Sequence, residues 1–312
     1  MATRDAFEDM AQEGRGDAGA LALGLRHGVT RVGLRALAAK AVHVAAAAPE
    51  RMVDIFDNAA AGWLGGAVFP PRTRLPDPLP ITEGFWRNLW NIAAPAVGAG
   101  RQGYAQQMME MAGELDPRIN SRMAAAALAL PGVAEATAGP IPGPFDVERL
   151  AQFPPASLGY ALSQEILRPG SPAADAYWTS VIPYLRHMPA PLNHINVQVI
   201  QCMPLWGLVA GYSLRPLDRV AMGGFLMGQV GHHYSALASA VTLTAAAARR
   251  PDNIEVVLDC LFKGWTQGRE TQLLLGVDWE SLFHLRVDQA RTALKVTAFD
   301  SPYAQAQRAM LM

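Results

Sequence analysis

Apolar residues recur along most of this chain at the three- and four-residue spacing of an α-helix. No stretch shows the strict alternation of apolar and polar positions that marks a half-buried strand. Proline-rich segments at 70–80 and 139–144 predict loops or linkers. The alanine-rich tracts that carry the helical spacing are residues 18–48, 83–113, 118–130 and 235–248. The pattern predicts an all-α protein, a multi-helix bundle with an apolar interior.

Two long stretches, residues 187–214 and 220–248, contain no aspartate, glutamate, lysine or arginine. Each is long enough to cross a bilayer, which takes about 20 apolar residues in a helix. The first, however, contains several prolines, asparagines and glutamines, and the second contains glycines, a glutamine and a pair of histidines. Unpaired polar groups are costly in hydrocarbon. We therefore interpret both stretches as buried helices around an apolar cavity rather than as transmembrane spans.

The first of these stretches carries a row of polar side chains on an otherwise apolar helix. Pro191 suits the first turn of this helix, and Pro204 is expected to end it. His194, Gln198 and Gln201 fall at positions i, i+4 and i+7, on one face. Because an exposed row would normally contain lysine or glutamate, this row is expected to face either a buried hydrogen-bond network or a ligand.

The second stretch is also expected to be helical, through the sequence RVAMGGFLMGQVGHHYSAL. Gly224 and Gly228 are four residues apart, so another helix, or a flat lipid chain, could approach the backbone closely there. Gln229 and His233 would share a face, and His232 would point about 100° away from them. The two histidines are therefore not expected to hold one metal ion, and a histidine packed beside glutamine is the plainer interpretation.

Composition narrows the class of protein. Charged residues make up 17% of the chain and the net charge is -1. A nucleic-acid-binding surface, which needs clustered basic residues, is therefore not expected. Cys202 and Cys260 lie far apart, which argues against a disulfide scaffold or a cysteine zinc site. The first residues carry charges of both signs and no apolar signal-peptide segment, so a reducing, cytoplasmic location is the default expectation.

Near the C-terminal end, the phrase LLGVDWESLFHLRVDQARTAL joins an apolar run to an acidic and aromatic turn. Gly276 is expected to end the preceding helix as a left-handed cap. Asp278 is expected to start the next helix as its N-cap, with Glu280 near the positive end of the helix dipole. Trp279 would anchor this corner to the core, and a further helix would start at Asp288.

This phrase resembles the C-terminal segment of the coenzyme Q (ubiquinone) biosynthesis protein 4 family. Two upstream segments are also similar to parts of that family: DVERLAQFPPASLGYALSQEIL at residues 146–167 and, more weakly, GGFLMGQVGHH at 223–233. The three segments occur in the family's order and together span roughly half of the chain. The resemblance implies a helical core at residues 116–312, preceded by an N-terminal helical extension at residues 1–115.

The resemblance also implies a metal site that this chain does not complete. Members of the family carry His-Asp-x-x-His, followed by a glutamate, a set that can hold a divalent ion such as zinc. Here His194 is kept, but Ile195 stands at the aspartate position and Gln198 at the second histidine. The glutamate falls near Asp218-Arg219. Since isoleucine cannot bind a metal and arginine would repel one, we expect a degenerate metal motif, with no metal and no other cofactor.

The leading hypothesis is a metal-free protein that binds a prenylated quinone, a quinone precursor or another isoprenoid lipid in support of ubiquinone biosynthesis. Polar residues would hold the head group, and apolar residues would lie along the tail. The residues assigned to this ligand are His194, Gln198, Gln201, Phe225, Leu226, Met227, Gln229 and His233. Peripheral membrane contact, other biosynthetic proteins as partners and a homo-oligomer are all compatible with this role.

Two other hypotheses stay open. The chain could be an enzyme with altered chemistry on an isoprenoid or aromatic substrate. His194 or His233 would then act as general acid or base, because imidazole titrates near neutral pH, and Asp218 and Glu270 would assist. Alternatively, the chain could be an interaction protein, a helical partner in a biosynthetic complex that binds no ligand of its own.

Overall fold

The computed structural model describes residues 4–66, 76–95, 103–169, 181–213, 215–249 and 254–300. The secondary structure of these residues is helical, with no strand among them, which confirms the expected all-α bundle. The helices before residue 130 are α1 (Arg4–Glu13), α2 (Ala18–His27), α3 (Arg31–Ala46), α4 (Met52–Leu64), α5 (Glu83–Ala93), α6 (Tyr104–Gly113) and α7 (Ile119–Leu128), with a 3₁₀ turn, η1, at Pro49–Arg51.

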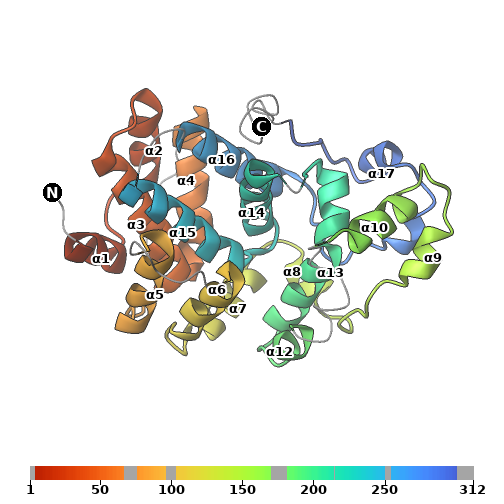
Figure 1. Cartoon of the computed structure of the whole chain (residues 1–312), viewed down its shortest axis with the longest axis horizontal. Coiled ribbons are helices and arrows are strands. Elements are labelled where there is room, and N and C mark those ends of the chain that lie inside the picture. The colour runs from red at the N-terminus through yellow and green to blue at the C-terminus, as the bar shows by residue number, and fades with distance from the viewer. Residues whose placement is uncertain are drawn as a thin grey trace.

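The remaining helices are α8 (Val133–Ala136), α9 (Val147–Ala151), α10 (Leu158–Leu167), α12 (Ile182–Arg186), α13 (Leu192–Ala210), α14 (Pro216–Val230), α15 (His233–Arg249), α16 (Ile254–Glu270) and α17 (Val287–Ala293), with a 3₁₀ turn, η2, at Glu280–Leu282. Figure 1 shows α1 to α4 on one side of the molecule and α9, α10 and α17 on the other. Helix α14 lies between these two sides, beside α16.

Short polar residues fix where several helices begin. The side chains of Asp17, Thr30, Thr82 and Ser157 accept hydrogen bonds from backbone N–H groups in the first turns of α2, α3, α5 and α10. Such caps satisfy donors that have no partner within the helix. The alanine-rich tracts singled out in the sequence all contain helices, because alanine loses little conformational entropy on entering one.

Three helix limits differ from those expected. Helix α13 continues through Pro204 to Ala210, because buried residues on both sides of the proline hold the rod against its neighbours despite one missing hydrogen bond. Gly231, at φ +63°, turns the chain between α14 and α15, so Gln229 and His233 do not share one helix face. Helix α16 ends at Glu270, before Gly276, which is left-handed as expected but lies in an irregular segment.

Helices α14 and α16 pack with their backbones in close contact. A Cβ added at Gly224 would lie 2.3 Å from the carbonyl oxygen of Leu261, and one added at Gly264 would lie 2.0 Å from that of Ala221. Gly228 and Gly268 meet the facing backbone in the same way, one turn further on. The spacing of Gly224 and Gly228 predicted such an approach, and the element that approaches is another helix.

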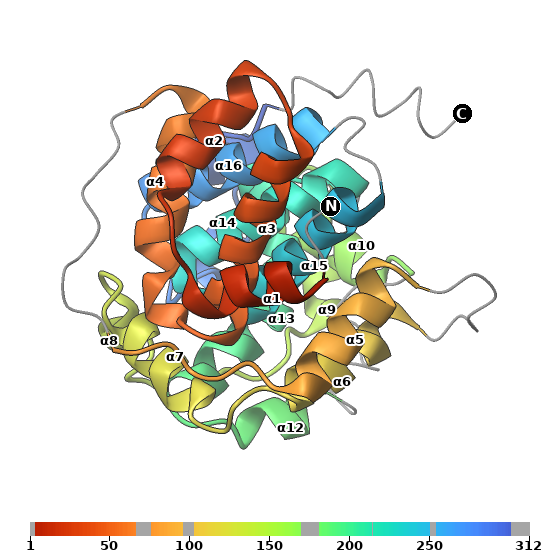
Figure 2. The same cartoon turned by 90° about the vertical axis from the view of Figure 1, so that its left-hand side faces the viewer.

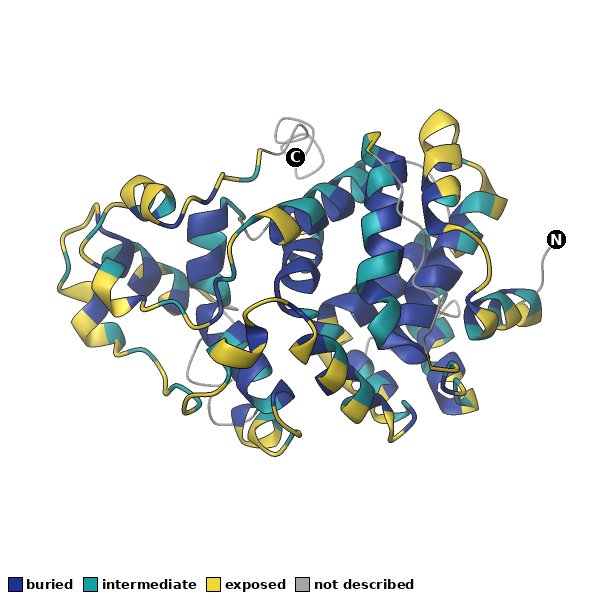
Figure 3. Cartoon of the chain, turned by 180° about the vertical axis from the view of Figure 1, so that it is seen from behind, coloured by how far each residue is buried: buried dark blue, intermediate teal, exposed yellow. Residues whose placement is uncertain are grey.

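The N-terminal helices share a core with α15 and α16. One cluster of buried apolar side chains runs from Phe7 through α3 and α4 to Trp265, and Figure 2 shows these helices in front of α14 and α16. The indole Nε1 of Trp265 donates to Asp57 Oδ1 at 2.8 Å. The central helices are correspondingly the most buried (Figure 3). The division at residue 115 stays a prediction, but a common core joins its two sides.

A second cluster packs α13 and α14 against α10 and the C-terminal segment. Trp279 is buried in it, as expected for an anchor at this corner. Asp278 Oδ1 accepts from the backbone N–H of Ser281 at 3.4 Å, beside the 3₁₀ turn η2. Helix α17 begins at Val287, one residue before Asp288. None of the described helices combines the length and apolarity needed to cross a bilayer.

Candidate functional site

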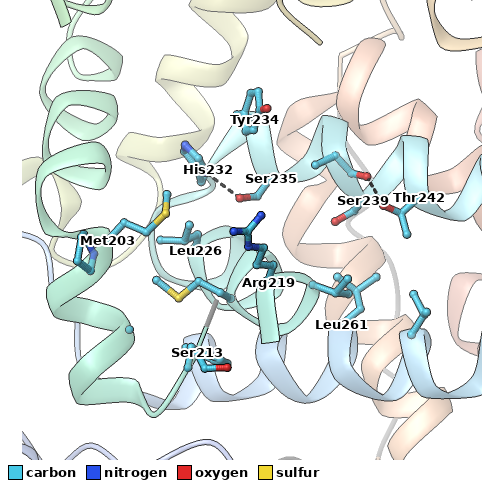
Figure 4. A pocket seen from close by; sticks show the side chains of 18 of the residues that line it. Met203, Ser213, Arg219, Leu226, His232, Tyr234, Ser235, Ser239, Thr242 and Leu261 are labelled. Carbon is cyan, nitrogen blue, oxygen red and sulfur yellow. Dashed lines mark hydrogen bonds between the residues drawn. The ribbon is translucent and has the colours of Figure 1, made fainter. Parts of the chain in front are cut away.

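A cavity of about 610 Å³ lies between α13, α14, α15 and α16, with the start of α6 and the end of α10 at its edge (Figure 4). Its apolar lining includes Met203 and Leu208 from α13, Met222 and Leu226 from α14, and Val257 and Leu261 from α16. Pockets of this volume that are lined mainly by apolar side chains are typical of small-molecule sites.

Glycines on two of these helices leave the cavity open. Gly207 of α13 and Gly223 of α14 both line it. A Cβ added at Gly223 would meet nothing nearer than the Cβ of Ser235, at 3.9 Å. The neighbouring Gly224 instead faces the backbone of α16. One helix therefore has room for a Cβ at one glycine and a closed backbone contact at the next.

A polar cluster forms where α15 begins, along one wall of the cavity. His232 lies in the turn before α15 and Ser235 in its first turn, and both line the cavity. His232 Nδ1 lies 2.8 Å from Ser235 Oγ. Burial and, to a smaller extent, the neighbouring His233 lower the pKa of His232 to about 3. The His232 imidazole is therefore neutral near neutral pH, and serves as a hydrogen-bonding group rather than as a charge.

Two arginines and one glutamate line the same cavity. Arg168 Nη2 lies 2.6 Å from Glu165 Oε1, so these two charges neutralise each other at the end of α10. Arg219, an exposed residue near the start of α14, forms no ion pair with a described residue. Figure 4 shows its guanidinium directed toward His232 and Ser235. The fixed charges of the described lining residues therefore leave one positive charge in excess.

The polar row on α13 lies elsewhere. His194 Nε2 is 3.2 Å from Gln198 Nε2, and Gln198 Oε1 accepts from the backbone N–H of Gly276 at 3.4 Å. Gln201 Nε2 donates to the carbonyl oxygen of Gly143. Burial lowers the pKa of His194, against a hydrogen bond with Gly139. These contacts link the row to the 139–143 loop and to Gly276, outside the cavity described above, and a ligand at this row stays a prediction.

Gln229 and His233 also bind backbone groups. Gln229 Nε2 lies 2.8 Å from the Gly268 carbonyl oxygen and 2.9 Å from that of Thr271, and Gln229 Oε1 accepts from Leu274 N–H at 2.8 Å. His233 Nε2 lies 2.6 Å from the carbonyl oxygen of Ala45, and burial lowers its pKa to about 4. These two side chains join distant segments of the chain.

The remaining assigned residues are dispersed. Phe225 and Met227 are buried in the two apolar cores, whereas Leu226 does line the cavity. Asp218 is buried in the first turn of α14, where it accepts from the backbone N–H and the hydroxyl of Ser213. Glu270 is exposed at the end of α16. Among the described residues, the hydrogen bonds of His194, His233 and Asp218 go to other groups and not to one another, and their catalytic roles stay predictions.

Sequence reasoning did not assign Arg219, His232 or Ser235 to a ligand. One signal was present, because Arg219 is the charged residue that borders the charge-free stretch 220–248. The direction of the Arg219 side chain depends on how α14 is rotated against α16, and this rotation is not predictable from the sequence. Among the described residues, no group of three or more histidine, cysteine, aspartate or glutamate side chains is placed to hold a metal ion.

Comparison with known proteins finds a distant likeness in structure. No family model matches the chain, and no curated protein matches it. The fold is similar to a crystal structure of a proposed ubiquinone biosynthesis protein from Nostoc punctiforme, with a TM-score of 0.49 and 15% sequence identity. The match covers 69% of this chain and 98% of that chain. A likeness this distant identifies neither a family nor an activity.

Proposed function

We propose that this protein binds an isoprenoid lipid, such as a prenylated quinone or a quinone precursor, and holds it in support of ubiquinone biosynthesis. The observation that carries the proposal is the cavity of about 610 Å³ between α13, α14, α15 and α16, with an apolar lining and a polar cluster on one wall. The sequence resemblance to the ubiquinone biosynthesis family supports the class of lipid.

The division of the lining favours an amphiphile over a wholly apolar ligand. Met222, Leu226 and Leu261 offer apolar contact on α14 and α16, where burying a hydrocarbon tail contributes roughly 25 cal/mol per Å² of apolar surface. His232 and Ser235 offer hydrogen bonds at the start of α15. A quinone or phenol ring would bind at this polar end, with its prenyl chain along the apolar wall.

Binding in this cavity is proposed to need no metal ion. The lining supplies one imidazole, from His232, and one carboxylate, from Glu165, which is already paired with Arg168. Zinc sites in proteins draw on three or four ligands from histidine, cysteine and acidic side chains. Treatment with a chelator should therefore leave the bound lipid in place.

The test is to fill the cavity without disturbing the fold. The variant Gly223→Leu places a side chain into the open space beside Ser235, and leucine is a better helix former than glycine by about 1 kcal/mol. Gly24→Leu is the matched control, because Gly24 is an exposed glycine within α2 that has no neighbouring atom within 4 Å of an added Cβ.

Each protein would be purified and studied by native mass spectrometry, with solvent extraction of bound lipid and titration with a short-chain ubiquinone. We expect the unmodified protein and Gly24→Leu to carry or take up the isoprenoid, and Gly223→Leu to lose it while melting at a similar temperature. The proposal fails if the unmodified protein binds no isoprenoid, or if Gly223→Leu binds it equally well.

A further inference from the structure

The cavity contains a cation whose charge the described residues do not balance. Arg168 is neutralised by Glu165 at 2.6 Å. Asp218, next to Arg219 in the sequence, is instead buried against Ser213. Arg219 lines the cavity from a solvent-exposed position and thus has no carboxylate partner among the described residues. An anion placed beside it would gain a charge-assisted hydrogen bond, the strong class of such bonds.

The surroundings of Arg219 add donors for the same anion. Its guanidinium is directed toward the start of α15 (Figure 4), and the N-terminus of this 17-residue helix carries a partial positive charge. Ser235 Oγ lies 2.8 Å from His232 Nδ1. When the proton of the neutral imidazole is on Nδ1, it donates to Ser235 Oγ, and the serine hydroxyl is free to donate to a ligand.

From this geometry we infer that the cavity binds amphiphiles with an anionic head group, a carboxylate or a phosphate, which Arg219 and Ser235 hold at the start of α15. The inference rests on the proposed function, because it names the head group of the lipid in the same cavity. It moves that head group away from the residues first assigned to it, since His194 and Gln201 contact the 139–143 loop and Gln198 contacts His194 and Gly276.

The test compares head groups on one tail: dodecanoate, dodecyl phosphate and dodecanol, titrated calorimetrically into the full chain. We expect both anions, or one of them, to bind about tenfold or more tightly than the alcohol, as expected for one charge-assisted hydrogen bond. The better of the two anions identifies the carboxylate or the phosphate as the preferred group.

Substitutions at Arg219 and Ser235 test whether these two residues cause the preference for the anionic probes. Arg219→Gln should remove the preference for the anion, and Arg219→Lys should keep part of it, because lysine retains the charge but not the planar fork. Ser235→Ala should reduce the preference by a smaller factor. Arg186→Gln is the control, since Arg186 is an exposed arginine on α12 outside the cavity lining, and it should bind all three probes as the unmodified protein does.

The outcomes separate this inference from the proposed function. If dodecanol binds as tightly as the anions, or if Arg219→Gln keeps the preference, the anionic site is wrong. The apolar cavity would still be supported in that case, provided Gly223→Leu blocks the probes. If no probe binds to the unmodified protein and no isoprenoid does, both the inference and the proposed function are overturned.

Discussion

Helix α14 has two faces that use similar residues in opposite ways. On one face, Gly224 and Gly228 let the backbone of α16 approach so closely that no side chain would fit between the two helices. On the other face, Gly223 borders a cavity with Met222 and Arg219. On the first face, the absence of side chains at the glycines lets two helices touch. On the second face, the absence of a side chain at Gly223 leaves room in the cavity.

The difference shows that a glycine in a buried helix is interpretable only together with what lies opposite. Gly224 and Gly228 face Gly264 and Gly268, so two glycine pairs complement each other. Gly223 faces Ser235, whose Cβ would lie 3.9 Å from a Cβ added at Gly223, an ordinary contact distance. The closed face should therefore govern stability, and the open face should govern binding.

The largest effect is expected from Gly264→Ala on the closed face. Its Cβ would lie 2.0 Å from the carbonyl oxygen of Ala221, so the two backbones would have to separate. Urea denaturation should show a loss of about 3 kcal/mol or more in the free energy of unfolding, as in severe overpacking. Gly223→Ala, on the open face, should cause no loss and a gain of up to about 1 kcal/mol. Equal stabilities for these two variants would contradict the distinction.

A smaller loss is expected from Gln229→Leu, at the end of the closed face. This side chain binds the backbone at Gly268, Thr271 and Leu274, and leucine would leave buried groups without partners. The expected cost is about 2 kcal/mol or more in the free energy of unfolding. The exposed Gln152→Leu, in contrast, should change it by less than about 0.5 kcal/mol. If Gln229→Leu unfolds like the unmodified protein, the segment after α16 is held by other contacts.

Near neutral pH the smallest effect is expected from His232 on the open face, because its contribution grows only as the pH falls. Its pKa is about 3 in the folded protein, against an ordinary value of 6.5. The unfolded chain therefore takes up a proton first as the pH falls below 6.5, and stability declines by about 1.4 kcal/mol per pH unit for this group.

His232→Asn should make the fall in stability between about pH 6 and pH 4 shallower by that amount, as measured from urea midpoints in a pH series. His284→Asn serves as the control, because His284 is exposed, and it should leave the slope unchanged. An unaltered slope in His232→Asn would mean that this imidazole is solvated in the folded state.

Much of the fold follows from the local sequence. The features that the local sequence does not predict depend on packing between distant segments. The helical tracts, the close approach at Gly224 and Gly228, and the burial of Trp279 were predictable from spacing and residue type. The continuation of α13 through Pro204 was not predictable in this way, because packing on both sides of the proline holds the helix. The sequence predicts a helix through Gly231, because glycine is tolerated within a helix, and the turn at this residue appears only in the folded chain.

The cavity could not be predicted in the same way. Its lining comes from α6, α10, α13, α14, α15 and α16, so it depends on how distant segments meet. The polar row at His194, Gln198 and Gln201 has the right chemistry for a ligand, but it meets a loop that the spacing along α13 does not reveal. The positive charge of Arg219 is unfavourable to a metal ion, and the same charge is favourable to an anion.

The N-terminal helices and the helices that line the cavity share one core, which limits the deletions that the chain can tolerate. Helices α15 and α16 line the cavity with one side and pack on α3 and α4 with the other. Phe56 of α4 lies with its ring centre 5.2 Å from that of Trp265. A deletion that removed the first helices would expose a large apolar surface of α15 and α16 to water. The cavity-lining helices therefore depend on α3 and α4 for their burial.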